Sequence, residues 1–105
     1  MRPRQITERP ATYHLLDVRE DEEWAAGHIA GAQHIPLKQL AARLDELPRE
    51  RDIVTVCRSG HRSGIAARGL VARGYRAENL EGGLEAWVEG GLPLRTADDA
   101  PGRVL

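Results

Sequence analysis

The sequence predicts an α/β fold, a small parallel sheet of four to five strands with helices on both faces. Short apolar runs rich in β-formers alternate along the chain with segments of helical spacing, and this alternation favours parallel strands joined by right-handed crossovers. The run from Ile53 to Val56 has no polar alternation, as expected of a strand buried on both faces. A chain of 105 residues is long enough for one domain with one core.

The first half of the chain is expected to contain two strands and two helices. Residues 1–10 are polar with two prolines, which predicts a poorly ordered arm or at most a short edge strand around residues 5–7. The elements predicted next are a strand over 13–18, a short helix over 21–26, a glycine-bounded loop with a short strand over 27–36, and an amphipathic crossover helix over 37–47.

The second half repeats the alternation. The elements predicted are the strand over 53–56, a helix over about 63–73, a strand over 75–80 and a helix over 84–89. We therefore expect an arm (1–10), one domain (11–94) and a loose tail (95–105). Trp24 and Trp87 are expected to anchor the core. His28 and His34 lie in the glycine-bounded loop, where hydrogen bonds that fix the loop are the favoured role.

The stretch IVTVCRSGHRSG, residues 53–64, contains the only cysteine of the chain. Cys57 follows the apolar run, and Ser59 and Gly60 predict a turn before the next helix. Ligands of open α/β sheets bind at the carboxyl ends of strands, and a helix N-terminus offers free backbone N–H groups that favour anions. Cys57 is therefore predicted to lie in a binding site.

The charges beside Cys57 point to reactivity. An isolated cysteine after an apolar run is commonly an inert core residue, but a core position is not normally followed by Arg58, Ser59, Gly60, His61 and Arg62. Positive charge and a helix N-terminus both lower a thiol pKa. We therefore predict a reactive thiolate and a site for an anionic substrate, with the role of His61 left open between raising the local potential and pointing to solvent.

Composition excludes several functions. The formal net charge is −1, so no basic field for nucleic acid is expected. A single cysteine excludes an intrachain disulfide, and scattered histidines make a metal site unfavourable. Residues 1–10 lack the apolar core of a signal peptide, and no apolar run approaches the roughly 20 residues of a membrane span. These features predict a cytoplasmic protein that works without a metal and away from membranes and nucleic acid. No cofactor is expected, and the protein is expected to be a monomer.

Four motifs occur in the order found in the rhodanese family of sulfurtransferases, and the resemblance covers the chain from about Leu15 to Pro93. They are LLDVRE at 15–20, GHIAGAQHIPL at 27–37, CRSGHRS at 57–63 and LEGGLEAWVEGGLP at 80–93. The resemblance implies a rhodanese-like fold and transfer of the outer sulfur of thiosulfate, through a cysteine persulfide, to cyanide or a thiol. Few residues precede the first strand, so the usual first helix of the family is expected to be shortened or missing.

The resemblance also implies roles for individual residues. Cys57 matches the sulfur carrier, and Arg58 and Arg62 match the cationic loop positions. Asp17 matches a residue that braces the loop, and Arg19 matches one that lies beside the substrate. The complete set expected to bind the donor is Arg58, Ser59, Gly60, His61, Arg62, Ser63 and Arg19, with the loop N–H groups stabilising the thiolate and then the persulfide.

Two other classes of function remain open. Tyrosine phosphatases place five residues between their cysteine and arginine, one more than separate Cys57 from Arg62 here, so a phosphatase or arsenate-reductase activity is the less favoured reading. The fold could also serve as a binding module in which Cys57 is incidental or redox-sensitive. A thiosulfate and cyanide assay beside an aryl phosphate assay separates these classes.

Overall fold

The computed structural model describes residues 1–105, and four parallel strands form its sheet in the order β2-β1-β3-β4. The strands are β1 (Tyr13–Asp17), β2 (Gln33–His34), β3 (Asp52–Val56) and β4 (Ala77–Asn79). The predicted α/β fold with a small parallel sheet is confirmed. The two central strands, β1 and β3, are the longest, and β2 and β4 are the edge strands.

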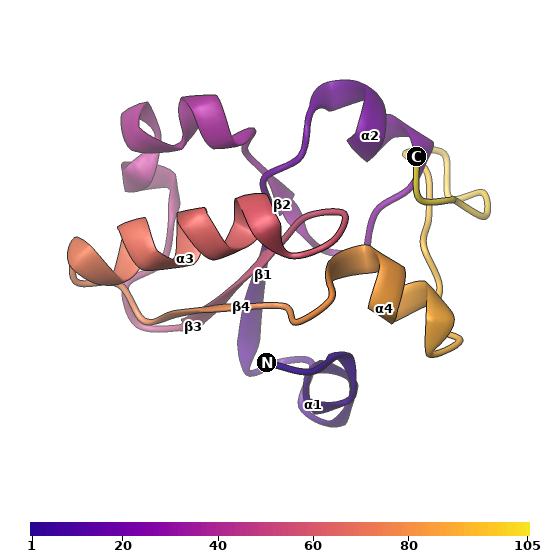
Figure 1. The fold of residues 1–105 in the computed structure, drawn as a ribbon, viewed down its shortest axis with the longest axis horizontal. Helices are drawn as coiled ribbons and strands as arrows, with labels where there is room; N and C mark the ends of the chain where they lie inside the picture. Colours follow the sequence, from indigo (N-terminus) through magenta and orange to yellow (C-terminus); the bar gives the residue numbers. More distant parts are fainter.

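Helical elements cover both faces of this sheet, and Figure 1 shows them on either side of the strands. One face carries α3 (His61–Ala72), η1 (Leu37–Ala42) and η2 (Leu44–Glu46), and the other carries α1 (Pro3–Glu8) and α4 (Gly83–Glu89). The short helix α2 (Asp21–Ala26) follows β1 and lies beside the chain's C-terminal segment. None of the helices is both long and apolar enough to span a bilayer.

Alternate residues of the central strands enter two separate apolar clusters, because successive side chains of a strand point to opposite faces. Ile53 packs in the cluster under α3 and η1, whereas Val54 and Val56 pack under α4 with Trp87. All three strand residues are at most 1% exposed. This explains why the sequence shows a continuous apolar run in place of polar alternation.

Strand register brings the ends of β1 and β3 level with each other. Asp17 at the end of β1 is paired with Val56 at the end of β3, and the amide of Val18 donates to the Val56 carbonyl at 3.0 Å. The polar residues that follow β1 and the cysteine that follows β3 therefore leave the sheet at the same edge, as expected for a parallel sheet.

The predicted N-terminal arm is helical, so the expectation of a disordered arm or an edge strand is wrong. Proline within the first turn suits helix α1, since that position needs no N–H donor. Ile6 is 3% exposed and belongs to the cluster with Trp87. One buried apolar residue thus fixes an otherwise polar helix against the sheet. The first helix, expected to be shortened or missing, is present with six residues.

The predicted crossover helix is replaced by two 3₁₀ segments, η1 and η2. Leu37, Leu40, Leu44 and Leu47 recur at spacings of three and four, which suits a 3₁₀ turn as well as an α-helix. Arg43 separates the segments, with φ of −123° and ψ of 22°. The apolar spacing is therefore retained, and Leu40 and Leu47 are buried, while the hydrogen-bond pattern differs from the prediction.

The predicted loose tail is packed against the rest of the domain. Arg95 forms isolated bridges with His28 and Pro101, and the amide of Arg103 donates to the Ala26 carbonyl at 2.9 Å. A Cβ on Gly102 would lie 2.6 Å from the Cα of Gly27. Two glycines thus permit a close backbone approach that the sequence at residues 95–105 did not suggest.

Trp87 is a core residue as predicted, but Trp24 is not. Trp87 is 4% exposed, whereas Trp24 is half-buried and stacks on His28 and His34 at centroid distances of 3.5 and 4.8 Å. His28 also bonds the Trp24 carbonyl, and His34 bonds the Arg19 carbonyl at 2.7 Å. The prediction that these histidines fix their loop through hydrogen bonds is confirmed.

Candidate active site in the Cys57 loop

The Cys57 loop, residues 57–63, comprises the connection from β3 to α3 and the first three residues of α3. Gly60 precedes the first helical residue with φ of +105°, a conformation that favours glycine, and α3 begins at His61. This turn folds the loop back over the cysteine. Cys57 is 1% exposed, so its sulfur lies at the base of the loop, at the N-terminus of a twelve-residue helix.

Three donors surround the Cys57 sulfur. The amides of Gly60 and Ser63 lie 3.1 and 3.4 Å from Sγ, and the Ser63 hydroxyl lies 3.2 Å from it. Burial alone would raise the thiol pKa and is the largest single influence, but the Ser63 hydroxyl and the amides of Ser63, Gly60 and Ser59 outweigh it. The net result is a pKa below the ordinary thiol value, as expected when several hydrogen bonds favour the anion.

Helix α4 determines the orientation of the loop peptides. The amide of Leu84 donates to the Cys57 carbonyl at 2.9 Å, and the amide of Glu85 donates to the Arg58 carbonyl at 3.0 Å. Both carbonyls therefore point away from the cysteine sulfur and towards α4. The free N–H groups at the start of α4 thus satisfy the carbonyl groups of the loop, which leaves loop amides directed at Sγ.

Arg62 forms an ion pair with Glu23 of α2. Its two terminal nitrogens donate to the two carboxylate oxygens at 2.7 and 2.9 Å. The Arg62 hydrogen bond is the largest of the influences that lower the pKa of Glu23, to about 2, and the same bond raises the pKa of Arg62. The Glu23 side chain is 17% exposed, so this bidentate pair fixes Arg62 against α2.

The remaining loop side chains are more open. Arg58 is 56% exposed and meets Glu85 through one contact of 3.2 Å, an arrangement that contributes little stability. Ser59 and His61 are exposed at the outer side of the loop. Of the two loop arginines, Arg58 can therefore turn to a bound anion with the smaller loss of existing contacts.

Asp17 and Arg19 form a buried pair beside this loop. The guanidinium of Arg19 donates to both Asp17 oxygens at 2.8 to 3.1 Å and to the Gly27 carbonyl at 2.7 Å. Arg19 is 0% exposed, so the direct donor contact expected from the sequence is not available in this conformation. Asp17 likewise holds Arg19 and makes no side-chain hydrogen bond to the Cys57 loop. The Nη1 atom of Arg19 is buried without a hydrogen-bond partner in the protein.

Three residues contact the loop in addition to those predicted from the sequence. Glu23 and Gly83 were assigned no role at the site from the sequence. Asn79 ends β4, and its side chain bonds Ser63 and Gly60 of the loop. All three lie far from Cys57 in the sequence, so a local pattern could not reveal their contacts with the loop.

The fold and this site define an α/β protein with an activated cysteine in a loop between a central strand and a helix N-terminus. The chain belongs to the rhodanese-like domain family, whose model matches residues 4–90. Membership of this family was expected from the four motifs and is confirmed.

Relatives and solved structures agree with this assignment. The chain is 43% identical to a sulfurtransferase of Allochromatium vinosum over 76% of each chain. It is 32% identical to the thiosulfate sulfurtransferase GlpE of Actinobacillus pleuropneumoniae serotype 3, over 79% of this chain and 78% of that one. The crystal structure of a rhodanese-related protein from Thermoplasma volcanium matches with a TM-score of 0.86 and 32% identity, covering 90% of this chain and 94% of that one. These relatives support a role in sulfur transfer.

Proposed function

We propose that this protein is a sulfurtransferase that carries the sulfane sulfur of thiosulfate, or of a related donor, as a persulfide on Cys57 and passes it to cyanide or a thiol. The observation that carries this proposal is the arrangement of the Gly60 amide, the Ser63 amide and the Ser63 hydroxyl around one buried sulfur. These donors stabilise a thiolate, which is the nucleophile in sulfur exchange. The pKa of Cys57 is lowered in accordance with this role.

The first half-reaction transfers one sulfur atom to the protein. The Cys57 thiolate attacks the outer sulfur of thiosulfate, a bond from Sγ to that sulfur forms, and the S–S bond of the donor breaks. The electron pair of the broken bond leaves with sulfite. Loop N–H groups then stabilise the negative charge on the terminal sulfur of the persulfide.

The second half-reaction returns the enzyme to its starting state. A thiolate or cyanide attacks the terminal sulfur, and the bond to Sγ breaks. The electron pair of this bond returns to Cys57 as a thiolate, and the acceptor leaves as a persulfide or as thiocyanate. Because the chain has no second cysteine, no other thiol of the same chain can attack the persulfide, which persists until an acceptor arrives.

Anion binding is proposed to rely mainly on Arg58. Its exposed single contact with Glu85 is readily exchanged for a thiosulfate oxygen, whereas the bidentate contact of Arg62 with Glu23 is retained. Cys57 is 1% exposed, so a sulfur atom at the tip of a small donor suits this site better than a bulky phosphoryl group.

The proposal is tested by intact mass spectrometry of the protein after incubation with thiosulfate and removal of the excess. The expected product is one sulfur atom heavier, and cyanide or a small thiol should restore the starting mass. Cys57→Ser should remain folded and gain no mass, because a hydroxyl does not ionise near neutral pH.

Two results would contradict the proposal. One is sulfur transfer by the wild type without a heavier species, and the other is equal mass gain in Cys57→Ser. Turnover of an aryl phosphate in a parallel assay should be negligible beside sulfur transfer. A phosphatase rate above the transfer rate would favour the phosphatase class instead.

A further inference from the structure

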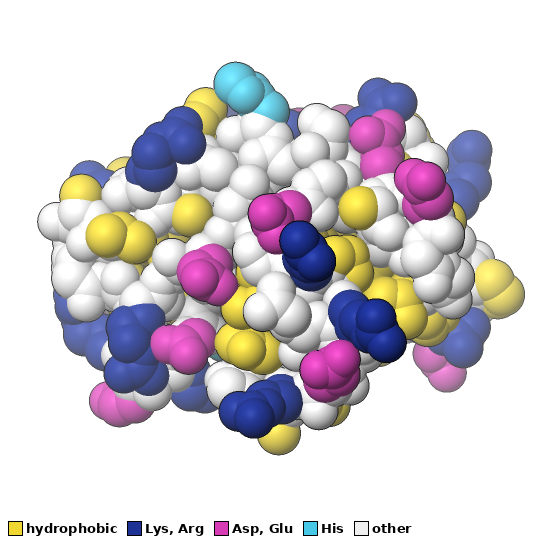
Figure 2. All heavy atoms as spheres, turned by 60° about the horizontal axis from the view of Figure 1, so that its bottom comes forward, with side chains coloured by type: hydrophobic (Ala, Val, Ile, Leu, Met, Phe, Trp, Pro, Cys, Tyr) yellow, Lys and Arg dark blue, Asp and Glu magenta, His cyan; other side chains and the backbone are white.

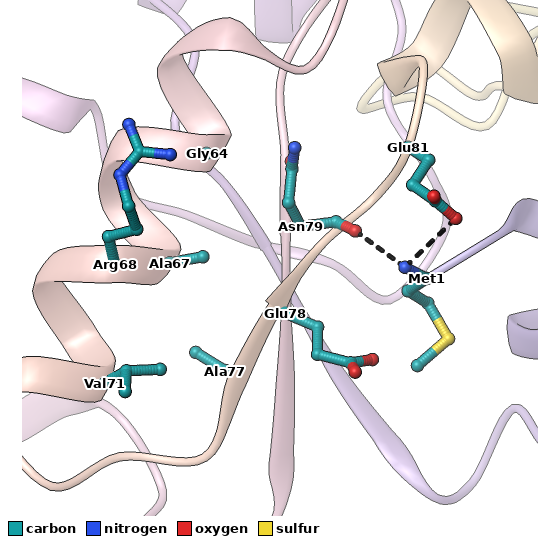
Figure 3. Close-up of a pocket in the computed structure, with 9 residues that line it drawn as sticks. All are labelled: Met1, Gly64, Ala67, Arg68, Val71, Ala77, Glu78, Asn79 and Glu81. Atoms are coloured by element: carbon teal, nitrogen blue, oxygen red, sulfur yellow. Dashed lines mark hydrogen bonds and ion pairs between the residues drawn. The ribbon is translucent and has the colours of Figure 1, made fainter.

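A groove of about 450 Å³ lies between α3 and the edge strand β4, and Asn79 forms part of its wall. Figure 3 shows the helix side with Gly64 and Ala67 and the strand side with Ala77 and Asn79. The Asn79 amide points towards the first turn of α3, beside Gly64. Its nitrogen lies 3.5 Å from the position of a Cβ at Gly64. The end of β4 is thus placed directly against the cysteine loop.

Both ends of the Asn79 amide engage this loop. The Nδ2 group donates to the Gly60 carbonyl at 3.0 Å, and Oδ1 accepts from the Ser63 hydroxyl at 2.5 Å. The amides of Gly60 and Ser63 lie 3.1 and 3.4 Å from the Cys57 sulfur. The Asn79 side chain is therefore hydrogen-bonded to both of these residues and not to Cys57 itself.

The Ser63 hydroxyl has two acceptors but only one proton. The Cys57 sulfur lies 3.2 Å from Oγ, and Asn79 Oδ1 lies 2.5 Å from it. When Cys57 is a thiolate, the hydroxyl donates best to the sulfur, because bonds to a charged acceptor are stronger. When Cys57 is a neutral thiol, its S–H can donate to Oγ while the hydroxyl donates to Asn79.

We propose that Asn79 is a positioning residue for sulfur transfer, which competes with the Cys57 sulfur for the hydrogen bond that the Ser63 hydroxyl donates. The inference rests on the proposed function. Once a persulfide forms, the charge moves from Sγ to the outer sulfur, and the hydroxyl turns back to Asn79. The proton stays on Ser63 Oγ throughout, and only its hydrogen-bond partner changes.

The position of Ser63 supports this role. The Thr55 hydroxyl donates to the Ser63 carbonyl at 2.7 Å, and Ser63 is 0% exposed. Its backbone is therefore fixed from β3, and water does not compete for its hydroxyl. The side chains of Cys57 and Asn79 are the two acceptors that remain.

The test measures the apparent pKa of Cys57 from the pH dependence of its alkylation by iodoacetamide. Asn79→Asp offers a stronger, charged acceptor, so it should raise the thiol pKa by about one unit. In a Ser63→Ala background the same substitution should have a clearly smaller effect, since the hydroxyl that links the two residues is absent. Equal shifts in the two backgrounds, or no shift at all, would overturn the proposal.

A matched control distinguishes the hydrogen-bond link through Ser63 from a general electrostatic effect of negative charge in the groove. Val71 lines the same groove and is 55% exposed, so Val71→Asp adds a carboxylate there without meeting Ser63. It should leave the thiol pKa close to that of the wild type. A shift equal to that of Asn79→Asp would show that any charge in the groove is sufficient, and the proposal would fail.

A second variant covers the case in which Asn79→Asp does not fold, as judged by thermal melting. In Asn79→Ala the Ser63 hydroxyl loses its competing acceptor, so removing that hydroxyl should raise the thiol pKa more than it does in the wild type. An identical effect of Ser63→Ala in both backgrounds would contradict the competition. Alkylation does not require sulfur transfer, so this result is independent of the mass experiment on Cys57.

Discussion

The backbone of Gly83 lies directly against Cys57. A Cβ on Gly83 would lie 2.5 Å from the Cys57 carbonyl oxygen and 2.5 Å from that of Arg58, and the residue has φ of +61°. Helix α4 begins at this glycine, so its first amides can reach the loop carbonyls. The absence of a side chain at Gly83 is therefore a requirement of the cysteine loop as well as of the turn.

Gly83→Ala should damage both stability and activity. The new methyl group must displace loop backbone and also adopt an unfavourable φ, at a combined cost of roughly 2 to 4 kcal/mol. Gly91→Ala is the matched control, because Gly91 has φ of +83° and nothing within 4 Å of its Cβ position. Chemical denaturation should show a loss of about 1 kcal/mol for the control. Similar losses for both variants would show that the loop contact contributes little.

The two loop arginines should differ in their effects. Arg58→Ala should lower kcat/KM for thiosulfate by about ten- to a hundredfold, because this is the loss expected when one charge-assisted hydrogen bond to the donor is removed. It should leave the melting temperature nearly unchanged, because the contact with Glu85 is exposed. Arg68→Ala is a suitable control, since Arg68 is exposed on α3. An unchanged kcat/KM in Arg58→Ala would exclude Arg58 from donor binding.

Arg62→Ala should reduce stability as well as activity. It leaves the Glu23 carboxylate, which is 17% exposed, without its guanidinium, and we expect a loss of about 1 to 3 kcal/mol. The double variant Glu23→Gln with Arg62→Ala should recover part of this stability, because no charge then remains unpaired. Denaturation of the four proteins measures the coupling, and strict additivity would argue against a cooperative pair.

The Glu23 pair also predicts a dependence of stability on pH. The folded pKa of Glu23 is about 2, below its ordinary value of 4.5, so the carboxylate binds protons more weakly in the folded state. The contribution of the Glu23 carboxylate to the free energy of unfolding is fully present above pH 4.5 and declines as the pH falls towards 2. The difference in unfolding free energy between wild type and Glu23→Gln, on the order of 2 kcal/mol near neutrality, should shrink across this range. A difference that stays constant with pH would contradict the assigned pKa.

Residues 95–105 should contribute to stability. Removing them deletes the bridge between Arg95 and His28 and the bond from Arg103 to Ala26. It also uncovers apolar surface beside Leu94, which is 4% exposed in the complete chain. Truncation after Leu94 should lower the melting temperature by several degrees. An unchanged melting temperature would support the loose tail expected from the sequence.

Surface charges of both signs lie close together on one face of the molecule. Figure 2 shows cationic and anionic side chains interspersed on the face that it draws, in agreement with the net charge of −1. The arginines at the cysteine loop are likewise matched by glutamates. Positive potential is therefore expected to act locally at the loop.

Local patterns in the sequence were sufficient to predict the sheet and the cysteine loop. A run of β-formers such as Ile53–Val56 can be recognised without its neighbours, because burial on both faces leaves no polar alternation. The turn at Ser59 and Gly60 likewise follows from residue type, since a positive φ favours glycine. The placement of Cys57 between strand and helix was therefore predictable from residues adjacent to it.

The tertiary structure decided which groups those loop residues contact. Glu23 and Glu85 are 39 and 27 positions from their arginine partners, and Asn79 is 16 positions from Ser63. Spacing along the chain contains no signal for such pairs, because they form only when α2, α4 and β4 pack around one sheet edge. Contacts between distant segments likewise explain the two terminal elements. Helix α1 is stabilised by burial of Ile6, and the tail by the close approach of Gly27 and Gly102. Local preference is a weak guide where burial by a distant segment supplies most of the free energy.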